Sequence, residues 1–93
     1  MILALDLGTT RVKGGLFNPR GECLATGSVD LPHRDEPDPL ASTVDALDWI
    51  AAVRTIDDIL LAGRIRPDCV VFSGNGPTLL PVDASDRPLF PAL

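Results

Sequence analysis

The sequence predicts an α/β domain, and three observations carry this prediction. Residues 2–29 hold three short, largely apolar segments that are separated by turn signals. Residues 45–63 show the three- and four-residue spacing of apolar side chains that is typical of one amphipathic helix. An apolar run at residues 69–72 follows this helix, and a strand after a crossover helix generally lies parallel to the strand before it. With 93 residues, the chain is long enough for one domain at most.

The first strand is predicted at Ile2–Leu7, where a mostly apolar run suits a central strand that is buried on both faces. Residues 8–10, Gly-Thr-Thr, form a turn. A second strand is predicted at Val12–Asn18, although Gly14 and Gly15 weaken it.

A turn signal, Asn-Pro-Arg-Gly at residues 18–21, leads into a third strand at Glu22–Val29. Because their connections are short, the three strands are expected to form an antiparallel meander. Residues 31–40 follow as an exposed loop, since their prolines block both a helix and a central strand. The charged residues of this loop are interpreted as a solvated face, with a flap that covers a substrate as the alternative. His33, the only histidine, is interpreted as a surface residue.

The helix is predicted at Asp45–Gly63. Asp45 can cap its amino end, Asp48 makes its first turn acidic, and Gly63 suits a left-handed cap at its carboxyl end. Trp49 is interpreted as a core residue and not as a platform for a ligand. The predicted apolar face consists of Trp49, Ala52, Val53, Ile56, Ile59 and Leu60.

Residues 69–72, Cys-Val-Val-Phe, read as a buried strand, and residues 73–77 as a turn at its carboxyl end. Another strand is predicted at Thr78–Val82, then a turn at residues 83–87 and an extended piece at residues 88–91. The chain stops without a closing helix or polar tail, so we expect it to be a truncated portion of a larger domain.

Composition and charge exclude several classes of partner. The net charge is −5 and the basic residues are scattered, which disfavours nucleic acid and anionic membranes as partners. The sequence has neither an apolar run of membrane-spanning length nor the pattern of a signal peptide, so a cytoplasmic location is expected. Cys23 and Cys69 match no metal-binding spacing and are interpreted as free thiols.

The residues after the first strand have the chemistry of a phosphate site. Asp6 ends that strand, and ligands gather at the carboxyl ends of strands in an open sheet. One carboxylate is a typical protein contribution to a Mg²⁺ site. Gly8 allows close approach of the backbone, and the amides of residues 8–10, with the hydroxyls of Thr9 and Thr10, can hold phosphate oxygens.

Arg11 and Lys13 can neutralise the charge on a phosphate, and strand alternation places both side chains on one face. The pattern is neither a Walker A loop nor a dinucleotide fingerprint, since both are longer glycine-spaced loops that open a helix. A hairpin in which these residues only satisfy the turn geometry is the alternative.

A second polar turn, Ser-Gly-Asn-Gly-Pro-Thr at residues 73–78, follows the strand that is predicted to be parallel to the first. It should therefore lie at the same sheet edge as Asp6. Asn75 and Thr78 can offer polar contacts to a hydroxyl-rich ligand, whereas a plain connecting turn is the alternative.

At these residues the chain resembles the amino-terminal portion of the FGGY carbohydrate kinases, which belong to the actin, hexokinase and Hsp70 superfamily of ATPases with a ribonuclease-H-like fold. The resemblance covers nearly all of the chain in order. Its strongest segment is Leu5–Lys13, which is similar to the first phosphate motif of the family. Further similar segments are Asn18–Glu22, Asp45 with Trp49, Val71–Asn75 and Val82–Leu93.

The resemblance implies an ATP-dependent kinase that transfers the γ-phosphoryl group to a hydroxyl of a sugar or polyol. Asp6 would help to hold Mg²⁺, through water, and residues 8–10 would face the ATP phosphates with Lys13 nearby. Residues 75–78 (Asn75, Gly76, Pro77 and Thr78) would line the sugar site.

Two departures qualify this resemblance. Family members commonly have glutamine where Asn75 stands, and Gly76 and Pro77 replace side chains that often touch the sugar, so the substrate is open. The family's catalytic base and adenosine pocket lie further along than Leu93, so the 93 residues alone are expected to be inactive.

The residues also leave alternatives open. One is a different ATPase of the same superfamily. The other is a non-catalytic module that binds phosphate or sugar, and association of two copies of the chain is open as well because a small sheet has uncovered edges.

Overall fold

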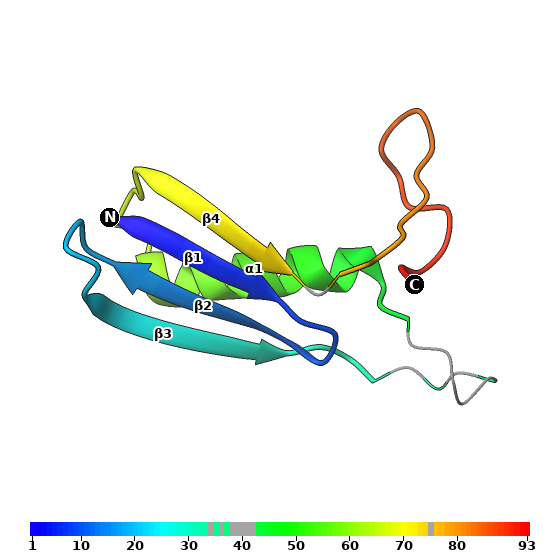
Figure 1. Ribbon diagram of the computed structural model, residues 1–93, viewed down its shortest axis with the longest axis horizontal. Helices are drawn as coiled ribbons and strands as arrows, with labels where there is room; N and C mark the ends of the chain where they lie inside the picture. Colours follow the sequence, from blue (N-terminus) through cyan, green and yellow to red (C-terminus); the bar gives the residue numbers. More distant parts are fainter. Residues whose placement is uncertain (34, 36, 38–42, 75) are drawn as a thin grey trace.

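The computed structural model describes residues 1–33, 35, 37, 43–74 and 76–93 as a four-stranded mixed sheet with one helix (Figure 1). The spatial order of the strands is β3-β2-β1-β4. The elements are β1 (Ile2–Leu7), β2 (Arg11–Phe17), β3 (Cys23–Asp30), α1 (Ala46–Leu61) and β4 (Cys69–Gly74).

β1 is an inner strand, antiparallel to β2 on one side and parallel to β4 on the other. β3 pairs antiparallel with β2 and forms one edge of the sheet. The first predicted strand has the observed bounds, and the second and third are shifted by one residue at each end. The parallel strand after the helix, which was predicted from the crossover rule, is confirmed.

The turn between β2 and β3 is closed by the side chain of Asn18. Its Oδ1 atom accepts hydrogen bonds from the amides of Arg20 and Glu22, each at 3.0 Å. Gly21 has φ = +82°, a conformation that favours glycine. The turn predicted at residues 18–21 is thus confirmed, and its asparagine and glycine explain the sharp reversal.

α1 begins where the sequence predicts. Asp45 is its N-cap, and the Oδ1 atom of Asp45 accepts a hydrogen bond of 2.9 Å from the amide of Leu47. The prediction for the carboxyl end is wrong by one residue: Ala62, and not Gly63, is the C-cap, with φ = 49° and ψ = 29°. Gly63 is left-handed as well, at φ = +66°, so the reversal takes two such residues.

The core lies between α1 and one face of the sheet. α1 packs against β2 and β3, and Gly14 of β2 allows the close approach. A Cβ atom on Gly14 would lie 2.4 Å from Cγ2 of Ile56. The predicted apolar face is correct except for Ile59, which is more than half exposed. The buried residues of the cluster are Leu3, Leu5, Val12, Ala52, Ile56 and Leu60.

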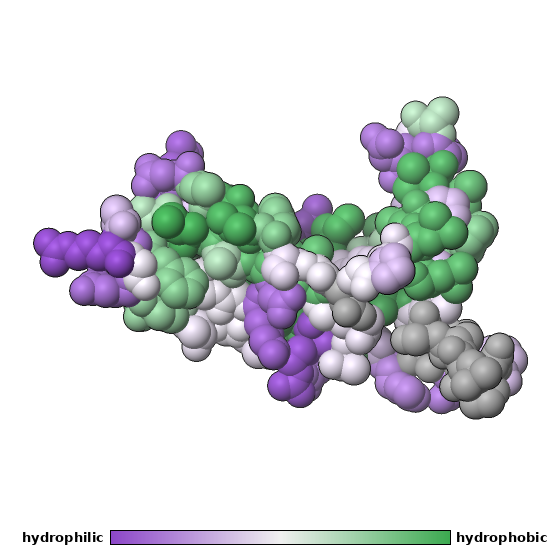
Figure 2. Space-filling model, viewed as in Figure 1, coloured by the Kyte–Doolittle hydropathy of each residue, from purple (hydrophilic) through white to green (hydrophobic). Residues whose placement is uncertain are grey.

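β4 contradicts the expectation of a buried strand. Every residue from Cys69 to Gly74 is exposed. The reason is that α1 packs over β2 and β3, and no described element covers either face of β4. Phe72 is 61% exposed. Figure 2 shows hydrophobic residues at the surface over β4 and over the segment that follows it.

The strand predicted at Thr78–Val82 is wrong. Instead, the segment after β4 forms an irregular loop that is held by isolated bridges, Val82 with Pro88 and Val44 with Ala92. The turn predicted at residues 83–87 is confirmed, since Oδ1 of Asp83 accepts from the amide of Arg87 at 3.0 Å. Prolines at positions 77, 81, 88 and 91 remove the backbone donors that a regular strand would need.

The remaining expectations concern the loop and the cysteines. Several residues of the predicted loop at residues 31–40 lie outside the described ones. His33, which is described, is exposed and lies 3.5 Å from a carboxylate oxygen of Asp35. Cys23 and Cys69 are free and exposed. Within the described part of the chain, no helix has the length and apolar character needed to cross a membrane.

Candidate functional site

Asp6 lies at the carboxyl end of β1, on the face of the sheet that α1 does not cover. Because side chains alternate along a strand, Leu5 points into the core and Asp6 points away from it. The strand register places Asp6 opposite Lys13 of β2 and Ser73 of β4. We call this side the open face. β1 is thus covered on one face only, so the expectation of a strand buried on both faces is wrong. The Asp6 carboxylate is exposed at the end of β1, where a ligand can reach it.

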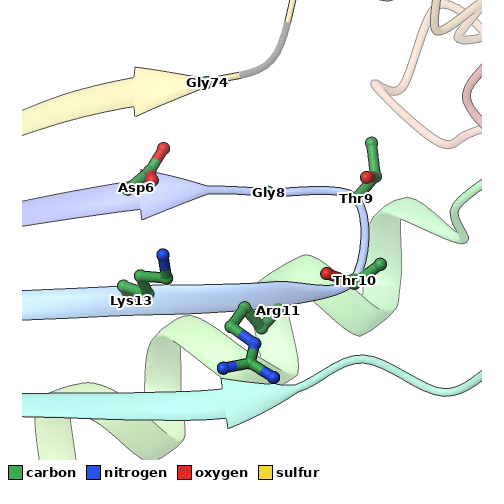
Figure 3. Close-up of a pocket in the computed structure, with 7 residues that line it drawn as sticks. All are labelled: Asp6, Gly8, Thr9, Thr10, Arg11, Lys13 and Gly74. Atoms are coloured by element: carbon green, nitrogen blue, oxygen red, sulfur yellow. The ribbon is translucent and has the colours of Figure 1, made fainter.

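An open cleft of about 470 Å³ surrounds this carboxylate. Figure 3 shows Asp6 and Lys13 on neighbouring strands, with Thr9 and Thr10 on the loop that connects them. The cleft is lined by polar and basic groups and by glycines. Its lining residues are Asp6, Gly8, Thr9, Thr10, Arg11, Lys13 and Gly74.

The loop between β1 and β2 is tightly closed at Gly8. The amide of Gly8 donates a hydrogen bond of 3.0 Å to the carbonyl of Arg11. A Cβ atom at position 8 would lie 2.6 Å from that same carbonyl oxygen, so the turn has no room for a side chain. The Gly8 amide, which the sequence suggested as a phosphate donor, is thus engaged within the turn. Gly8 instead shapes the turn that presents Thr9 and Thr10.

Thr9 and Thr10 carry hydrogen-bond donors that do not take part in closing the loop. Both side chains are exposed, and the carbonyl of Thr10 accepts from the amide of Leu31 at 2.9 Å. Within the described residues, the amides of Thr9 and Thr10 donate to no backbone carbonyl. Two amides and two hydroxyls at one bend form a concave set of donors of the kind that binds anions.

The two basic residues of β2 have different surroundings. Arg11 and Lys13 lie on the open face, as alternation predicts, but Nε of Arg11 lies 3.5 Å from Oδ1 of Asp30 on β3. Among the described residues, Lys13 has no ion pair. Lys13 is therefore the cation that is available beside Asp6, whereas Arg11 is turned toward a carboxylate.

Sequence reasoning missed one contact of this loop. The indole Nε1 of Trp49, in the first turns of α1, donates a hydrogen bond of 2.9 Å to the carbonyl of Gly8. Trp49 packs against the core cluster, in agreement with its interpretation as a core residue. The signal that was available is the polar N–H of tryptophan, which needs an acceptor when the ring is buried.

The second predicted turn is only partly described. Asn75 lies outside the described residues, but Gly74, directly before it, lines the cleft beside Asp6. The end of β4 therefore meets the end of β1, as the parallel pairing predicts. Gly76, Pro77 and Thr78 are exposed.

The donor set limits what metal the cleft can hold. The described residues contain no group of three or more His, Cys, Asp or Glu side chains that could hold a metal ion. Of the lining residues that the structure describes, Asp6 is the one that carries a carboxylate. Such a site fits Mg²⁺ that keeps most of its waters and takes other ligands from a phosphate, and it does not fit a structural zinc or calcium site.

Comparison with solved structures shows which proteins share this fold. A gluconate kinase from Lactobacillus acidophilus matches with a TM-score of 0.88 and 22% identity over 99% of this chain and 19% of its own. A xyloylose (xylulose) kinase from Brucella ovis matches with a TM-score of 0.88 and 30% identity over 98% of this chain and 20% of its own. A glycerol kinase from Plasmodium falciparum, solved with ADP, matches with a TM-score of 0.81 and 12% identity over 99% of this chain and 19% of its own.

The chain thus spans about one fifth of the length of these structures. Neither a protein-family model nor a curated protein sequence matches it. The structural neighbours of this chain are sugar and glycerol kinases, and its mixed four-stranded sheet with one helix matches a part of their fold.

Proposed function

We propose that this chain is the amino-terminal part of an ATP-dependent carbohydrate kinase of the FGGY type, which transfers the γ-phosphoryl group of ATP to a hydroxyl of a sugar or polyol. The observation that carries the proposal is the cleft at the end of β1. It combines one exposed carboxylate, two threonines on a tight glycine turn and a lysine that has no ion pair among the described residues. The likeness to kinases over 97–99% of the chain supports it further.

In this proposal each cleft residue acts through position and charge. The amides and hydroxyls of Thr9 and Thr10 bind phosphate oxygens, and the ammonium group of Lys13 neutralises their charge. The carboxylate of Asp6 holds Mg²⁺ through water, and the ion, when bound, supplies charge neutralisation on the phosphates. Arg11 is a weaker candidate for phosphate binding because it is paired with Asp30.

The acceptor side of the proposal uses the turn after β4. Asn75 to Thr78 would line the site of the sugar or polyol, next to the phosphate cleft, because Gly74 borders that cleft. Glycine and proline at positions 76 and 77 offer no polar side chain to a hydroxyl. Binding of the acceptor would therefore depend on Asn75, Thr78 and backbone groups at this turn.

The test is the substitution Asp6→Asn in the complete kinase, with Asp58→Asn as the matched control. Both replace an exposed carboxylate by an amide, but Asp58 lies on α1, away from the cleft. A coupled assay of ADP release over a panel of sugars and polyols should show turnover that Asp6→Asn abolishes and Asp58→Asn preserves, with unchanged circular dichroism. Undiminished turnover by Asp6→Asn would remove this residue from the mechanism.

The 93 residues by themselves are proposed to bind without turnover. Calorimetric titration with MgATP measures that binding, and size-exclusion chromatography measures whether copies associate through the uncovered β4 edge. Binding of MgATP in a complete protein that phosphorylates no member of the panel would favour the alternative function, a module that binds phosphate without catalysis.

A further inference from the structure

A hydrogen bond between Trp49 and Gly8 joins α1 to the loop of residues 8–10, which is here called the phosphate loop. We propose that Trp49 is a positioning residue, which directs the Thr9 amide into the cleft by holding the Gly8 carbonyl on the opposite side. This inference rests on the proposed function, since it assigns a role in phosphate binding. It extends that function to a residue that does not line the cleft.

The argument begins with the direction of the Gly8 carbonyl. α1 lies on the core face of the sheet, opposite the open face that carries Asp6 and Lys13. The Nε1 atom of Trp49 lies 2.9 Å from the carbonyl oxygen of Gly8. The carbonyl therefore points toward the helix and away from the open face.

The geometry of the peptide bond relates the direction of the Thr9 amide to that of the Gly8 carbonyl. The Gly8 carbonyl and the Thr9 amide belong to one peptide unit, and in a planar trans unit the N–H points opposite to the C=O. The Gly8–Thr9 unit is trans, since it is not among the cis peptides found in the described part of the chain. A carbonyl held against the helix thus requires that the Thr9 amide points toward the cleft, where phosphate oxygens would bind.

Other contacts fix the rest of the loop but leave this peptide free. The Gly8 amide is bonded to the Arg11 carbonyl, and the Thr10 carbonyl is bonded to the Leu31 amide. Neither bond involves the Gly8 carbonyl or the Thr9 amide. Glycine has wide backbone freedom, so without a partner for its carbonyl the Gly8–Thr9 unit could turn over. The indole N–H is the described group that prevents this.

The packing of Trp49 makes it a firm anchor. Its ring contacts the core cluster, and it projects from the first turns of a helix that Asp45 caps. The side chain therefore has little freedom to follow a moving loop. The contact also joins residues that are 41 positions apart in the chain, so it depends on docking of α1 onto the sheet.

The first experiment compares Trp49→Phe, which keeps an aromatic ring and removes the N–H, with Val53→Ala, which trims a neighbouring residue of the same helix face. Calorimetry on the full chain measures the affinity for MgATP and for magnesium tripolyphosphate. We expect Trp49→Phe to weaken both by about threefold to tenfold, the effect of losing one neutral hydrogen bond. Val53→Ala should lower the melting temperature and leave both affinities within about twofold of wild type.

The second experiment measures local opening of the loop in the absence of a ligand. Amide hydrogen exchange should accelerate at Gly8, whose amide is bonded to the Arg11 carbonyl, in Trp49→Phe, while amides in the paired part of β3 keep their wild-type rates. Unchanged exchange at Gly8 would contradict the attachment.

The outcomes separate this proposal from the one on which it rests. If the wild-type chain binds the probes and Trp49→Phe binds them equally well, the role of Trp49 is overturned and the phosphate site stands. An equal loss of affinity in Val53→Ala would also overturn it, because the effect would then follow from general destabilisation. If the wild-type chain binds neither probe, the proposed function fails, and the positioning role fails with it.

Discussion

β1 and β4 are neighbouring parallel strands of equal length and similar hydrophobicity, yet their surroundings differ completely. In β1, Leu3 and Leu5 are buried beneath α1. In β4, Val70 and Phe72 occupy the corresponding register positions and are exposed. The difference arises because α1 crosses β2 and β3, so its cover reaches β1 and stops before β4. An apolar strand thus gains stability only where another element covers it.

The same comparison explains where the candidate site lies. The packed half of the molecule, made of β1 to β3 and α1, holds the backbone of the loop between β1 and β2 in place. The half that consists of β4 and the segment after it contributes Gly74 to the cleft and little to the core. Substitutions should therefore have large effects on stability in the first half and small effects in the second.

The largest effect on stability is expected in a comparison of Ile56→Ala, in the packed half, with Phe72→Ala, in β4. Ile56 has no exposed surface, so Ile56→Ala leaves a cavity and should cost about 2–5 kcal/mol of unfolding free energy. Phe72 is 61% exposed, so Phe72→Ala should change stability by less than about 0.5 kcal/mol. Urea denaturation of both variants measures the contrast. A comparable loss in Phe72→Ala would show that β4 is covered in solution.

The next effect sharpens the comparison within the packed half. Gly14→Ala would place its Cβ atom 2.4 Å from Ile56, which forces α1 away from the sheet and should cost about 1–3 kcal/mol. Gly27→Ala is the control, because its Cβ atom would meet the nearest side chain at an ordinary 3.7 Å. Denaturation midpoints should fall for Gly14→Ala and hold or rise for Gly27→Ala. Equal midpoints would mean that the helix does not rest on Gly14.

A smaller effect is expected at the carboxyl end of α1, where the chain leaves the packed half. Ala62 is left-handed at φ = 49°, a strained conformation for alanine, so Ala62→Gly should stabilise by about 0.5–1 kcal/mol. Gly63→Ala, at φ = +66°, should instead destabilise, although its Cβ atom would meet nothing within 4 Å. Thermal unfolding measures both. Loss of stability in Ala62→Gly would contradict the left-handed cap.

The smallest effect concerns two carboxylates whose pKa values move in opposite directions. Burial, with repulsion from Asp58, raises the pKa of Asp57 above its ordinary 3.8, and its Oδ1 atom is buried without a hydrogen-bond partner among the described residues. A raised folded pKa favours the protonated form, so this carboxylate costs stability once the pH rises past its folded pKa. Asp57→Asn should therefore stabilise by no more than about 0.5 kcal/mol at pH 7 and by nothing below pH 3.8.

Asp68, directly before β4, has a pKa that is shifted in the opposite direction. The hydrogen bond from the amino-terminal ammonium group, at 2.7 Å, holds the pKa of its carboxyl below 3.8. A lowered folded pKa stabilises the fold above the unfolded pKa, and this stability is lost as the pH falls through the folded pKa. The melting temperatures of Asp68→Asn and Asp57→Asn are measured as the pH is lowered. Relative to wild type, the two variants should show opposite changes in stability above pH 3.8. Parallel pH profiles would contradict both assignments.

The sequence was informative wherever a local interaction decides the structure. The cap at Asp45, the turn at Asn18 and the alternation that places Arg11 and Lys13 on one face depend on residues within a few positions of each other, and each could be predicted. The parallel direction of β4 was also predictable, because a crossover helix generally connects parallel strands.

Features that depend on contacts between residues far apart in the chain could not be predicted from the sequence. The exposure of Phe72 depends on how far α1 extends over the sheet, which no pattern within β4 indicates. The bond between Trp49 and Gly8 connects two segments whose spacing carries no signal. The closure of the Gly8 amide onto Arg11 likewise depends on the path of the loop, so an expected phosphate donor proved to be engaged.

The parallel register of β1 with β4 has a consequence for synthesis of the chain. Ile2 pairs with Cys69, so β1, which is synthesised before the other three strands of this sheet, receives its last partner only after the helix and the turn behind it have been made. The hairpins of β1, β2 and β3 can meanwhile form from neighbouring residues, and their short loops close rapidly. One side of β1 therefore waits with unpaired amides and carbonyls in the nascent chain, at the strand that presents Asp6.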